Sequence, residues 1–381
     1  MSKTGHERSI CFVLPNWNFR YPAGGADIVY QLAHDLAEDE FNVTVIHIND
    51  TLGYLYHATG QGIFRPKRGA KRFLLSHSFT RSLLRLSFKL ARKTDYNFGI
   101  LQKVRTNGAM NPSKIKDYDT IIATGWQTAY FVNEYLQIHD PKRAFYLVQH
   151  SEDDPSFSEI GSSYASKTYE FPLKKLVINE SVLSRFKSED PRKFHVGIDT
   201  SFFKISKGIE ERDPRSVLVP LKFSKSKGAK FAIEAMNQLK KDVPGMKFSS
   251  YGDLERTEVP DYVDYYAVPS RKKLRELYND AAIFILPSLI EGFGLPGLEA
   301  MACGACVIAT ANGGSEEYLK NGINGLSIPT RDSVAIQEAA KRLVSDVDLR
   351  IKLSQNGVET ARKFTYARMY HEFKKLMEST P

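Results

Sequence analysis

The chain has little of what secreted disulfide-rich proteins and membrane-spanning proteins need. It contains three cysteines and two tryptophans in 381 residues. So few cysteines exclude a disulfide framework and are typical of a reducing compartment. The longest apolar run, around 281–286, is far shorter than the roughly 18 residues that a membrane-spanning helix requires. The polar stretch 1–8 leads directly into a predicted strand, so we expect no secretory signal and a cytoplasmic protein.

The sequence also lacks internal repeats and low-complexity tracts. Its content of 42% hydrophobic and 25% charged residues is typical of a globular protein and excludes a disordered or collagen-like chain. A length of 381 residues exceeds one ordinary core and suits two domains of about 150–200 residues each.

The net charge of +9 comes from 53 basic and 44 acidic residues, and one segment accounts for the excess. Residues 65–93 contain ten Lys or Arg and no Asp or Glu. Within this segment, 78–93 has an apolar helical face opposite a basic stripe. Such a helix either lies on an anionic membrane surface or packs on the first domain with a solvated basic face. The stripe consists of Arg81, Arg85, Lys89 and Arg92.

Short β-branched or aromatic runs alternate with Gly- or Pro-bearing loops and helical patterns. This alternation predicts parallel sheets flanked by helices, in two doubly wound halves. We expect a linker near 197–203, which gives domains of 1–200 and 201–364 and a final helix at 365–381. The predicted strands are 10–14, 43–48, 121–123, 145–148, 176–178, 217–219, 247–251, 265–268, 283–286, 306–309 and 325–328. The predicted helices are 26–38, 228–241, 270–281, 331–346 and 348–362.

The loop after the predicted strand 283–286 carries the densest chemical signal. The backbone amides of Phe293, Gly294 and Leu295 precede a helix and predict an anion site, and Gly292 lets the backbone approach a phosphate. Carboxylates beside such a site suit hydroxyl groups. We therefore expect Glu291 to face the sugar and Glu299 to face the ribose of a sugar nucleotide. The alternative is that Glu291 is solvated and Glu299 only complements the helix N-terminus.

A second loop, 220–230, also follows a strand and opens a helix. It presents Lys222 and Lys227 toward the same end of the predicted sheet. Two cations beside an anion-binding helix terminus suit a departing nucleoside diphosphate, whose developing charge must be stabilised.

Residues 291–304 read Glu-Gly-Phe-Gly-Leu-Pro-Gly-Leu-Glu-Ala-Met-Ala-Cys-Gly. This stretch resembles the Glu-x7-Glu signature of the family-4 retaining glycosyltransferases of the GT-B fold. The resemblance is specific over about 197–366 and thinner in the first half. Further matching segments are 197–202, 227–228, 252–253, 313–317 and 321–325.

The resemblance implies an α/β fold of GT-B architecture, with two facing Rossmann-like parallel-sheet domains and a deep interdomain cleft. It implies that the nucleoside diphosphate sugar binds mainly to the second domain and the acceptor to the first, and that the last helix crosses back. It also implies site residues beyond the signature. Gly24 and Gly25 would face the diphosphate, His150 the donor sugar, Gly252 the donor, and the 265–270 loop with Val268 the base.

Three positions depart from the family pattern. Lys222 stands where the family usually has Arg, so bidentate phosphate contact is replaced there by a point charge. Cys306 stands where the family usually has Pro, and Gly297 stands where the family usually has Pro or Leu. The spacing of Cys303 and Cys306 is that of a redox pair, but its place between a helix end and a strand favours two buried thiols.

Other first-half residues leave alternatives open. Trp17 and Trp126 lie in predicted loops at strand ends and suit either sugar stacking or ordinary packing. The acidic run 152–154 could orient the acceptor, but we favour a solvated turn. Residues 149–155 and 161–165 are weakly similar to bacterial polysaccharide rhamnosyltransferases. The first half contains no Gly-x-Gly-x-x-Gly string, which disfavours a nicotinamide or flavin enzyme.

We expect no metal and no cofactor beyond the donor substrate. The Asp-x-Asp strings at 117–119 and 346–348 lie at the wrong end of their predicted sheets, and no His/Cys cluster has zinc spacing. The sequence thus predicts a metal-independent hexosyl- or deoxyhexosyltransferase acting on a glycan or lipid-linked glycan in cell-surface polysaccharide synthesis, peripheral to the membrane. The alternatives are another GT-B enzyme, such as a sugar-nucleotide epimerase, or a basic nucleic-acid-binding protein, although no nucleic-acid recognition motif occurs.

Overall fold

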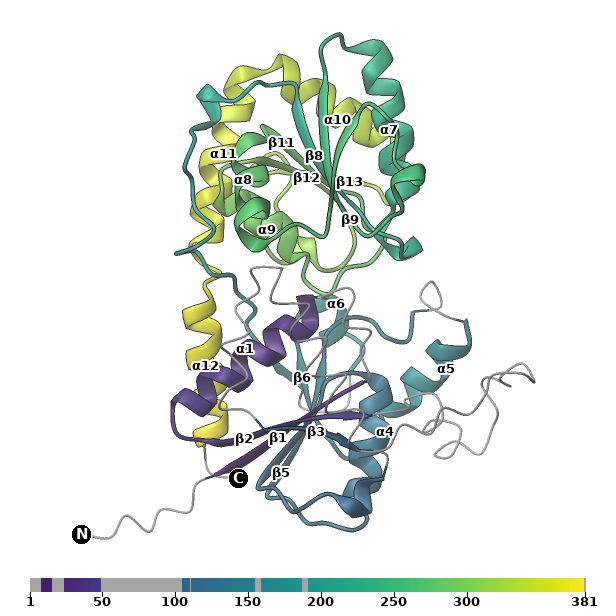
Figure 1. The fold of residues 1–381 in the computed structure, drawn as a ribbon, viewed down its shortest axis with the longest axis vertical. Helices are drawn as coiled ribbons and strands as arrows, with labels where there is room; N and C mark the ends of the chain where they lie inside the picture. The colour runs from purple at the N-terminus through teal and green to yellow at the C-terminus, as the bar shows by residue number, and fades with distance from the viewer. Residues whose placement is uncertain are drawn as a thin grey trace. The chain divides into compact units, whose positions relative to one another are not determined.

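A computed structural model of the chain forms two compact units, described separately here (Figure 1). Unit 1 comprises Met1–Val177, Phe186–Arg192 and Lys374–Pro381, and unit 2 comprises Ile178–Arg185 and Lys193–Phe373. These units differ from the predicted 200/201 boundary in that 178–185 and 193–200 pack with unit 2. The structure describes residues 8–15, 24–48, 105–109, 111–154, 159–186 and 191–379.

Unit 1 is built on a seven-stranded sheet with the order β3-β2-β1-β4-β5-β6-β7. The pairings from β3 to β6 are all parallel. The middle strands are buried apolar runs, as expected for strands covered on both faces. The strands are β1 (Ser9–Leu14), β2 (Asn42–Ile48), β3 (Arg105–Ala109), β4 (Thr120–Ala123), β5 (Arg143–Val148), β6 (Lys174–Val177) and β7 (Arg192–Lys193).

The helices described in unit 1 follow its strands. The last helix, α12, begins in unit 2 and ends in unit 1, where Arg143 donates hydrogen bonds to the carbonyls of Leu376 and Met377. These bonds anchor the end of the chain on unit 1. The helices are α1 (Gly24–Glu38), α4 (Trp126–Tyr135), α5 (Glu159–Thr168) and α12 (Tyr366–Glu378), and the single-turn α6 (Glu180–Leu183) packs with unit 2.

Unit 2 has a six-stranded, fully parallel sheet with the order β10-β9-β8-β11-β12-β13. In Figure 1, α7 and α10 lie together on one side of the sheet and α9 and α11 on the other. The strands are β8 (Ser216–Leu221), β9 (Lys247–Gly252), β10 (Val263–Ala267), β11 (Ile283–Leu286), β12 (Cys306–Thr310) and β13 (Leu326–Ile328). The helices are α7 (Ala229–Asp242), α8 (Arg271–Asp280), α9 (Leu295–Ala302), α10 (Ser333–Ser345) and α11 (Val347–Ala361).

The first six strands of each sheet are arranged in the same order. From the middle of the sheet, one series of consecutive strands runs toward one edge and the next series runs toward the other edge. The order reverses between β1 and β4 in unit 1 and between β8 and β11 in unit 2. Ligands of open parallel sheets bind outside the carboxyl ends of the strands at such a reversal. The loops after β8 and β11 are therefore the first place to look for a site in unit 2.

The predicted α/β class and every predicted strand and helix are confirmed, with ends moved by a few residues. The prediction missed β3, whose Arg-Thr-Asn-Gly-Ala sequence has no apolar run, as well as β7, α4, α5 and α6. Trp126 is the first residue of α4 and does not lie in a loop. Trp17, Arg81, Arg85, Lys89 and Arg92 lie outside the described residues.

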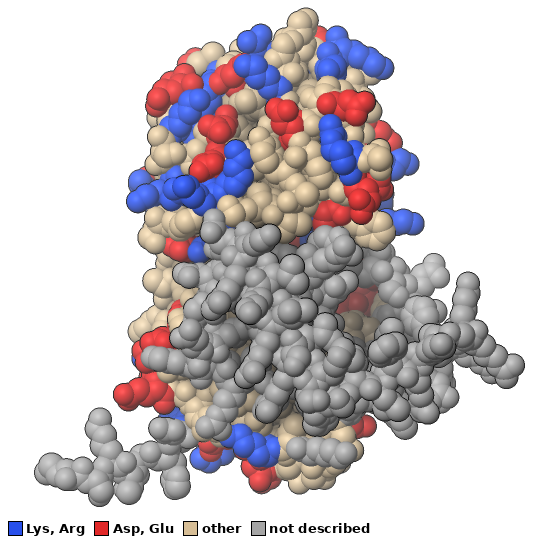
Figure 2. All heavy atoms as spheres, viewed as in Figure 1, with Lys and Arg blue, Asp and Glu red and all other residues tan. Residues whose placement is uncertain are grey.

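On the face shown in Figure 2, Lys/Arg and Asp/Glu side chains of unit 2 are interspersed. Within the described ranges, no helix is long and apolar enough to cross a bilayer.

Candidate functional site

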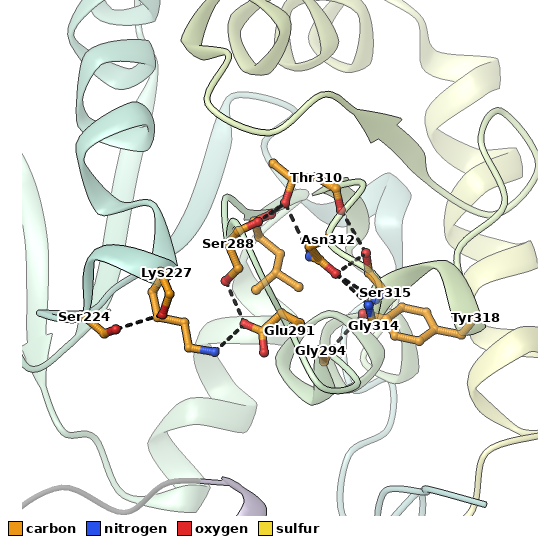
Figure 3. Close-up of polar contacts among 12 residues, drawn as sticks. Ser224, Lys227, Ser288, Glu291, Gly294, Thr310, Asn312, Gly314, Ser315 and Tyr318 are labelled. Carbon is orange, nitrogen blue, oxygen red and sulfur yellow. Dashed lines mark hydrogen bonds and ion pairs between the residues drawn. The ribbon is translucent and has the colours of Figure 1, made fainter. Parts of the chain in front are cut away.

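The loops that follow β8 and β11 touch one another at the carboxyl edge of the unit 2 sheet (Figure 3). Gly228 has a φ of +67°, and a Cβ atom there would lie 2.0 Å from the carbonyl oxygen of Pro287. The amide of Leu289 donates to the carbonyl of Ser226 at 2.7 Å. Only glycine allows this close approach, and it brings the side chain of Lys227 over the loop after β11.

Lys227 and Glu291 form an ion pair where these loops meet. The Lys227 Nζ lies 2.9 Å from Glu291 Oε1, and the Ser288 hydroxyl donates to the same oxygen at 2.7 Å. The Lys227 side chain is 34% exposed and the Glu291 side chain 12%. The structure thus brings these two predicted residues into contact and adds Ser288, which the sequence did not indicate (Figure 3).

Two side chains from outside the glycine-rich loop 291–295 hold its carbonyl groups. Gly294, at φ +79°, is the N-cap of α9, and its carbonyl accepts the Tyr318 hydroxyl at 2.7 Å. The side-chain amide of Asn179 donates to the carbonyl of Gly292. In the first turn of α9, Pro296 has no amide hydrogen and the Gly297 amide donates to the Gly294 carbonyl at 2.9 Å. The Leu295 amide has no acceptor within the helix, and the positive end of the helix dipole lies beside it, so this terminus favours an anion.

The loop after β12 supports the same region. Asn312 Oδ1 accepts hydrogen bonds from the amides of Gly314 and Ser315 at 3.1 and 2.9 Å, and the Asn312 carbonyl accepts the Glu291 amide at 3.1 Å. The Thr310 hydroxyl donates to the carbonyl of Ser288. The Gly-Gly-Ser-Glu-Glu motif at 313–317 marked this loop in the sequence, but its role in fixing Glu291 required the fold (Figure 3).

The strand ends of β8, β9 and β10 are tied together beside these loops. A Cβ at Gly252 would lie 1.7 Å from the carbonyl oxygen of Leu221, so only glycine fits. Asp253 accepts the amide of Phe223 at 2.6 Å, next to the half-buried Lys222. Val268 follows β10 at φ +45°, a strained conformation for a β-branched residue, and its amide donates to the Gly252 carbonyl. Gly252 and Val268 thus lie together at the carboxyl edge of the unit 2 sheet.

Glu299 lies one turn into α9, half-buried on the side of α8. Its Oε2 accepts the hydroxyl of Tyr278 at 3.0 Å. In unit 2, Glu299 thus shares α9 with the glycine-rich loop, Lys227 pairs with Glu291, and Val268 is bonded to Gly252.

In unit 1, the start of α1 meets the loop after β5. A Cβ at Gly25 would lie 2.2 Å from Gln149 Oε1, and the Gln149 side chain donates to the carbonyl of Thr124 at 3.1 Å. His150 is the next residue and is half-buried. Gly24 opens α1. The predicted first-half residues Gly25 and His150 are therefore placed around one loop at the carboxyl edge of their sheet.

The interpretation of 152–154 as a solvated turn is wrong for Glu152. This residue is 5% exposed, the Tyr146 hydroxyl donates to its carboxyl group, and so does the backbone amide of Trp126. Burial raises the pKa of Glu152 to about 8. Asp153 accepts the Tyr169 hydroxyl at 3.2 Å. The sequence suggests a solvated turn because the contacts that bury Glu152, with Tyr146 and the start of α4, come from segments that are not adjacent to it in sequence.

Two further predictions concern Trp126 and the cysteines. Trp126 packs edge-on against Tyr130, with ring centroids 6.4 Å apart. Cys303 and Cys306 are buried free thiols, and burial raises the pKa of each to about 12, which confirms the structural interpretation. Among the described residues, no group of three or more His, Cys, Asp or Glu is placed to hold a metal ion.

Most of unit 2 matches a known protein family. Residues 201–360 match the family of glycosyl transferases group 1. The chain is 31% identical over 202 residues to the putative glycosyltransferase EpsD of Bacillus subtilis, covering 48% of this chain and 52% of EpsD. It is 32% identical over 195 residues to a probable sucrose-phosphate synthase of Thermosipho melanesiensis, covering 47% and 43%. The chain thus spans about half the length of these curated relatives.

Solved structures with the same fold cover nearly the whole chain. Sucrose-phosphate synthase of Thermosynechococcus elongatus superimposes with a TM-score of 0.69 at 18% identity, over 97% of this chain and 98% of that one. Anabaena Alr3699/HepE, solved in complex with UDP-glucose, gives 0.68 at 16% identity over 97% and 99%. At these identities the likeness establishes the fold. The chain therefore has the two-sheet GT-B fold, and its residues 201–360 match the group 1 family of glycosyl transferases.

Proposed function

We propose that the protein transfers a sugar, with retention of configuration, from a nucleoside diphosphate sugar to a glycan or lipid-linked glycan acceptor in cell-surface polysaccharide synthesis. The observation that carries the proposal is the Lys227–Glu291–Ser288 array beside the glycine-rich start of α9, at the strand-order reversal of a group 1 domain. HepE, which has the same fold, was solved with UDP-glucose, and EpsD is named a putative glycosyltransferase.

The site chemistry suits a departing diphosphate. Backbone amides at the start of α9 and the cations of Lys222 and Lys227 would stabilise the negative charge that develops as the sugar–phosphate bond breaks. Glu291, fixed by Ser288 and by the Asn312 carbonyl, would orient the sugar hydroxyls. Lys227 already pairs with Glu291. An incoming phosphate would share the Lys227 cation with Glu291, so neither side chain would be left as an unpaired buried charge.

In this proposal the configuration of the anomeric carbon is retained because the acceptor oxygen attacks that carbon from the same face that the diphosphate leaves. The acceptor oxygen bonds to the anomeric carbon as the carbon–phosphate oxygen bond breaks, and the acceptor proton passes to the leaving phosphate. A covalent sugar–protein adduct trapped during turnover would contradict this mechanism. His150, in unit 1, would contact the donor sugar.

The first experiment is thermal stabilisation by UDP, GDP, ADP and dTDP, each with and without EDTA. A ligand at 100 times its Kd stabilises the folded state by about 2.7 kcal/mol, which a melting curve resolves. We expect one nucleotide to stand out and EDTA to leave its effect unchanged. The absence of a shift with all four would contradict the donor site, and loss of the shift in EDTA would contradict metal independence.

The basic segment 65–93 supports a second element of the proposal, attachment to an anionic membrane surface. Its ten Lys or Arg residues, with no acid among them, would provide several kcal/mol of attraction, at about 1 kcal/mol for each residue near the surface. Such attachment would bring the enzyme to a lipid-linked acceptor.

A further inference from the structure

Two buried tyrosines form a hydrogen-bonded chain that ends on Glu299. Tyr278, in α8, donates its hydroxyl to Glu299 Oε2 at 3.0 Å. The hydroxyls of Tyr278 and Tyr251 lie 2.9 Å apart, and Tyr251 is the penultimate residue of β9. A hydroxyl carries one proton, and that of Tyr278 goes to Glu299. Tyr251 must therefore be the donor to Tyr278, and the chain runs in one direction toward the carboxylate.

The surroundings leave these hydroxyls little freedom. Tyr278 is 0% exposed and Tyr251 5%. The Tyr278 ring packs edge-on against Phe203 and Phe284, at centroid distances of 5.9 and 5.4 Å. A hydroxyl enclosed by aromatic rings is costly unless it is hydrogen-bonded, so the cage enforces the contact with Glu299.

The protonation of the chain is fixed across the physiological range. Burial is the largest cause that raises the pKa of both Tyr251 and Tyr278 far above the usual tyrosine value. Tyr251 and the Glu299 carboxylate raise the pKa of Tyr278 further. Both side chains therefore remain hydroxyl donors at any pH at which the protein works.

We infer that Tyr278 and Tyr251 are positioning residues that hold the Glu299 carboxylate for the ribose hydroxyls of the donor nucleotide. The inference rests on the proposed function and adds a determinant of sugar recognition to it. Tyr278 sets the direction of one carboxylate oxygen, and Tyr251 orients the Tyr278 hydroxyl. Side chains locked in this way lose little freedom when the ligand binds.

The test measures ribose recognition separately from general binding. Calorimetry gives the Kd of the nucleoside diphosphate that binds the wild type, and of its 2′,3′-dideoxy form. If that nucleotide is dTDP, the comparison is with its 3′-deoxy form. For Tyr278→Phe we expect the parent nucleotide to bind about tenfold more weakly, the effect of one misplaced hydrogen bond to a charged group. The dideoxy form should bind as it does to the wild type.

Two further variants complete the cycle. Tyr251→Phe leaves the Tyr278–Glu299 contact in place and should cost less, about threefold. In a Glu299→Gln background, Tyr278→Phe should cause no additional loss of affinity, because the carboxylate that Tyr278 positions is already absent. The matched control is Tyr262→Phe, which removes a 2.7 Å hydrogen bond to Asn237 before the start of β10 and should leave both affinities unchanged.

The outcomes separate this inference from the proposed function. A wild type that binds no nucleoside diphosphate refutes both. A wild type that binds its nucleotide but does not distinguish the dideoxy form refutes the inference alone. The inference is also refuted if Tyr278→Phe weakens the binding of the parent nucleotide and of the dideoxy form equally, because an equal loss indicates a purely structural role. If Tyr278→Phe does not fold, the same comparison on Tyr251→Phe decides.

Discussion

Replacement of Lys227 by alanine should slow sugar transfer by about 10²-fold or more while leaving unit 2 folded. The ammonium of Lys227 lies 2.9 Å from Glu291 Oε1, and the Lys227 side chain is 34% exposed, so a ligand can reach it. Removing one group that stabilises developing negative charge typically costs 10²–10³-fold in kcat, or about 2.7–4 kcal/mol.

The same substitution should affect stability far less than rate. A partly exposed ion pair contributes about 1 kcal/mol or less to folding. For a domain of 150–250 residues this corresponds to a fall in Tm of about 2–4 °C. Glu291 also keeps the Ser288 hydroxyl as a donor, so its carboxylate is not left without a hydrogen bond. The rate and the stability therefore respond differently to one change.

The assay compares kcat for transfer and Tm for the wild type, Lys227→Ala and a matched control. Lys230→Ala is the control, because this lysine lies in the next helix, is 78% exposed and pairs only loosely with Glu234 at 3.9 Å. The control should keep wild-type activity. A Lys227→Ala rate within about fivefold of wild type, at saturating donor, would refute the role of this cation.

Three further predictions concern other groups. Glu291→Ala should cut transfer by about 10²-fold, measured with the same assay, and near-normal turnover would remove Glu291 from the site. The folded-state pKa of Glu152 is raised from 4.5 to about 8, so the native state holds a proton that the unfolded state has lost between these values. Stability from this group therefore falls as pH rises from about 4.5 to 8 and then levels off. The Tm of the wild type should therefore fall relative to that of Glu152→Gln, which has no carboxyl group to titrate, and a constant difference over that range would contradict the buried neutral acid. Replacing the basic stripe with glutamine should release the protein from anionic vesicles in a flotation assay but spare activity on a soluble acceptor, and unchanged flotation would exclude the membrane role. The substituted residues are Arg81, Arg85, Lys89 and Arg92.

Much of the unit 2 site was predictable because its signals are local. Glycine at 228, 252 and 294 and the charges at 227 and 291 occupy loops next to strands that are apolar enough to identify from sequence. Parallel strands bring their carboxyl ends to one edge, so residues in these loops converge without further information. The pairing of Lys227 with Glu291 is a direct consequence.

The residues that were missed act through contacts between distant segments. Asn179 reaches the Gly292 carbonyl across 113 positions of sequence, and Tyr251, Tyr278 and Glu299 come from a strand and two helices. Nothing near Asn179 in the sequence marks it as part of a phosphate loop. Such partners follow from packing, because a buried polar group must find a hydrogen bond wherever the fold supplies one.

The sequence by itself determined the alternating α/β pattern, the glycines required by close backbone approaches and the charges at the strand ends, because backbone sterics and hydrophobic periodicity act over a few residues. Only the tertiary structure decided which polar groups are buried and what they contact. Glu152 shows this most clearly: its neighbours in sequence suggest a solvated turn, yet the fold encloses it between Tyr146 and the start of α4. Burial depends on segments far apart in the chain, and it changes the chemistry of a carboxyl group more than its sequence neighbours do.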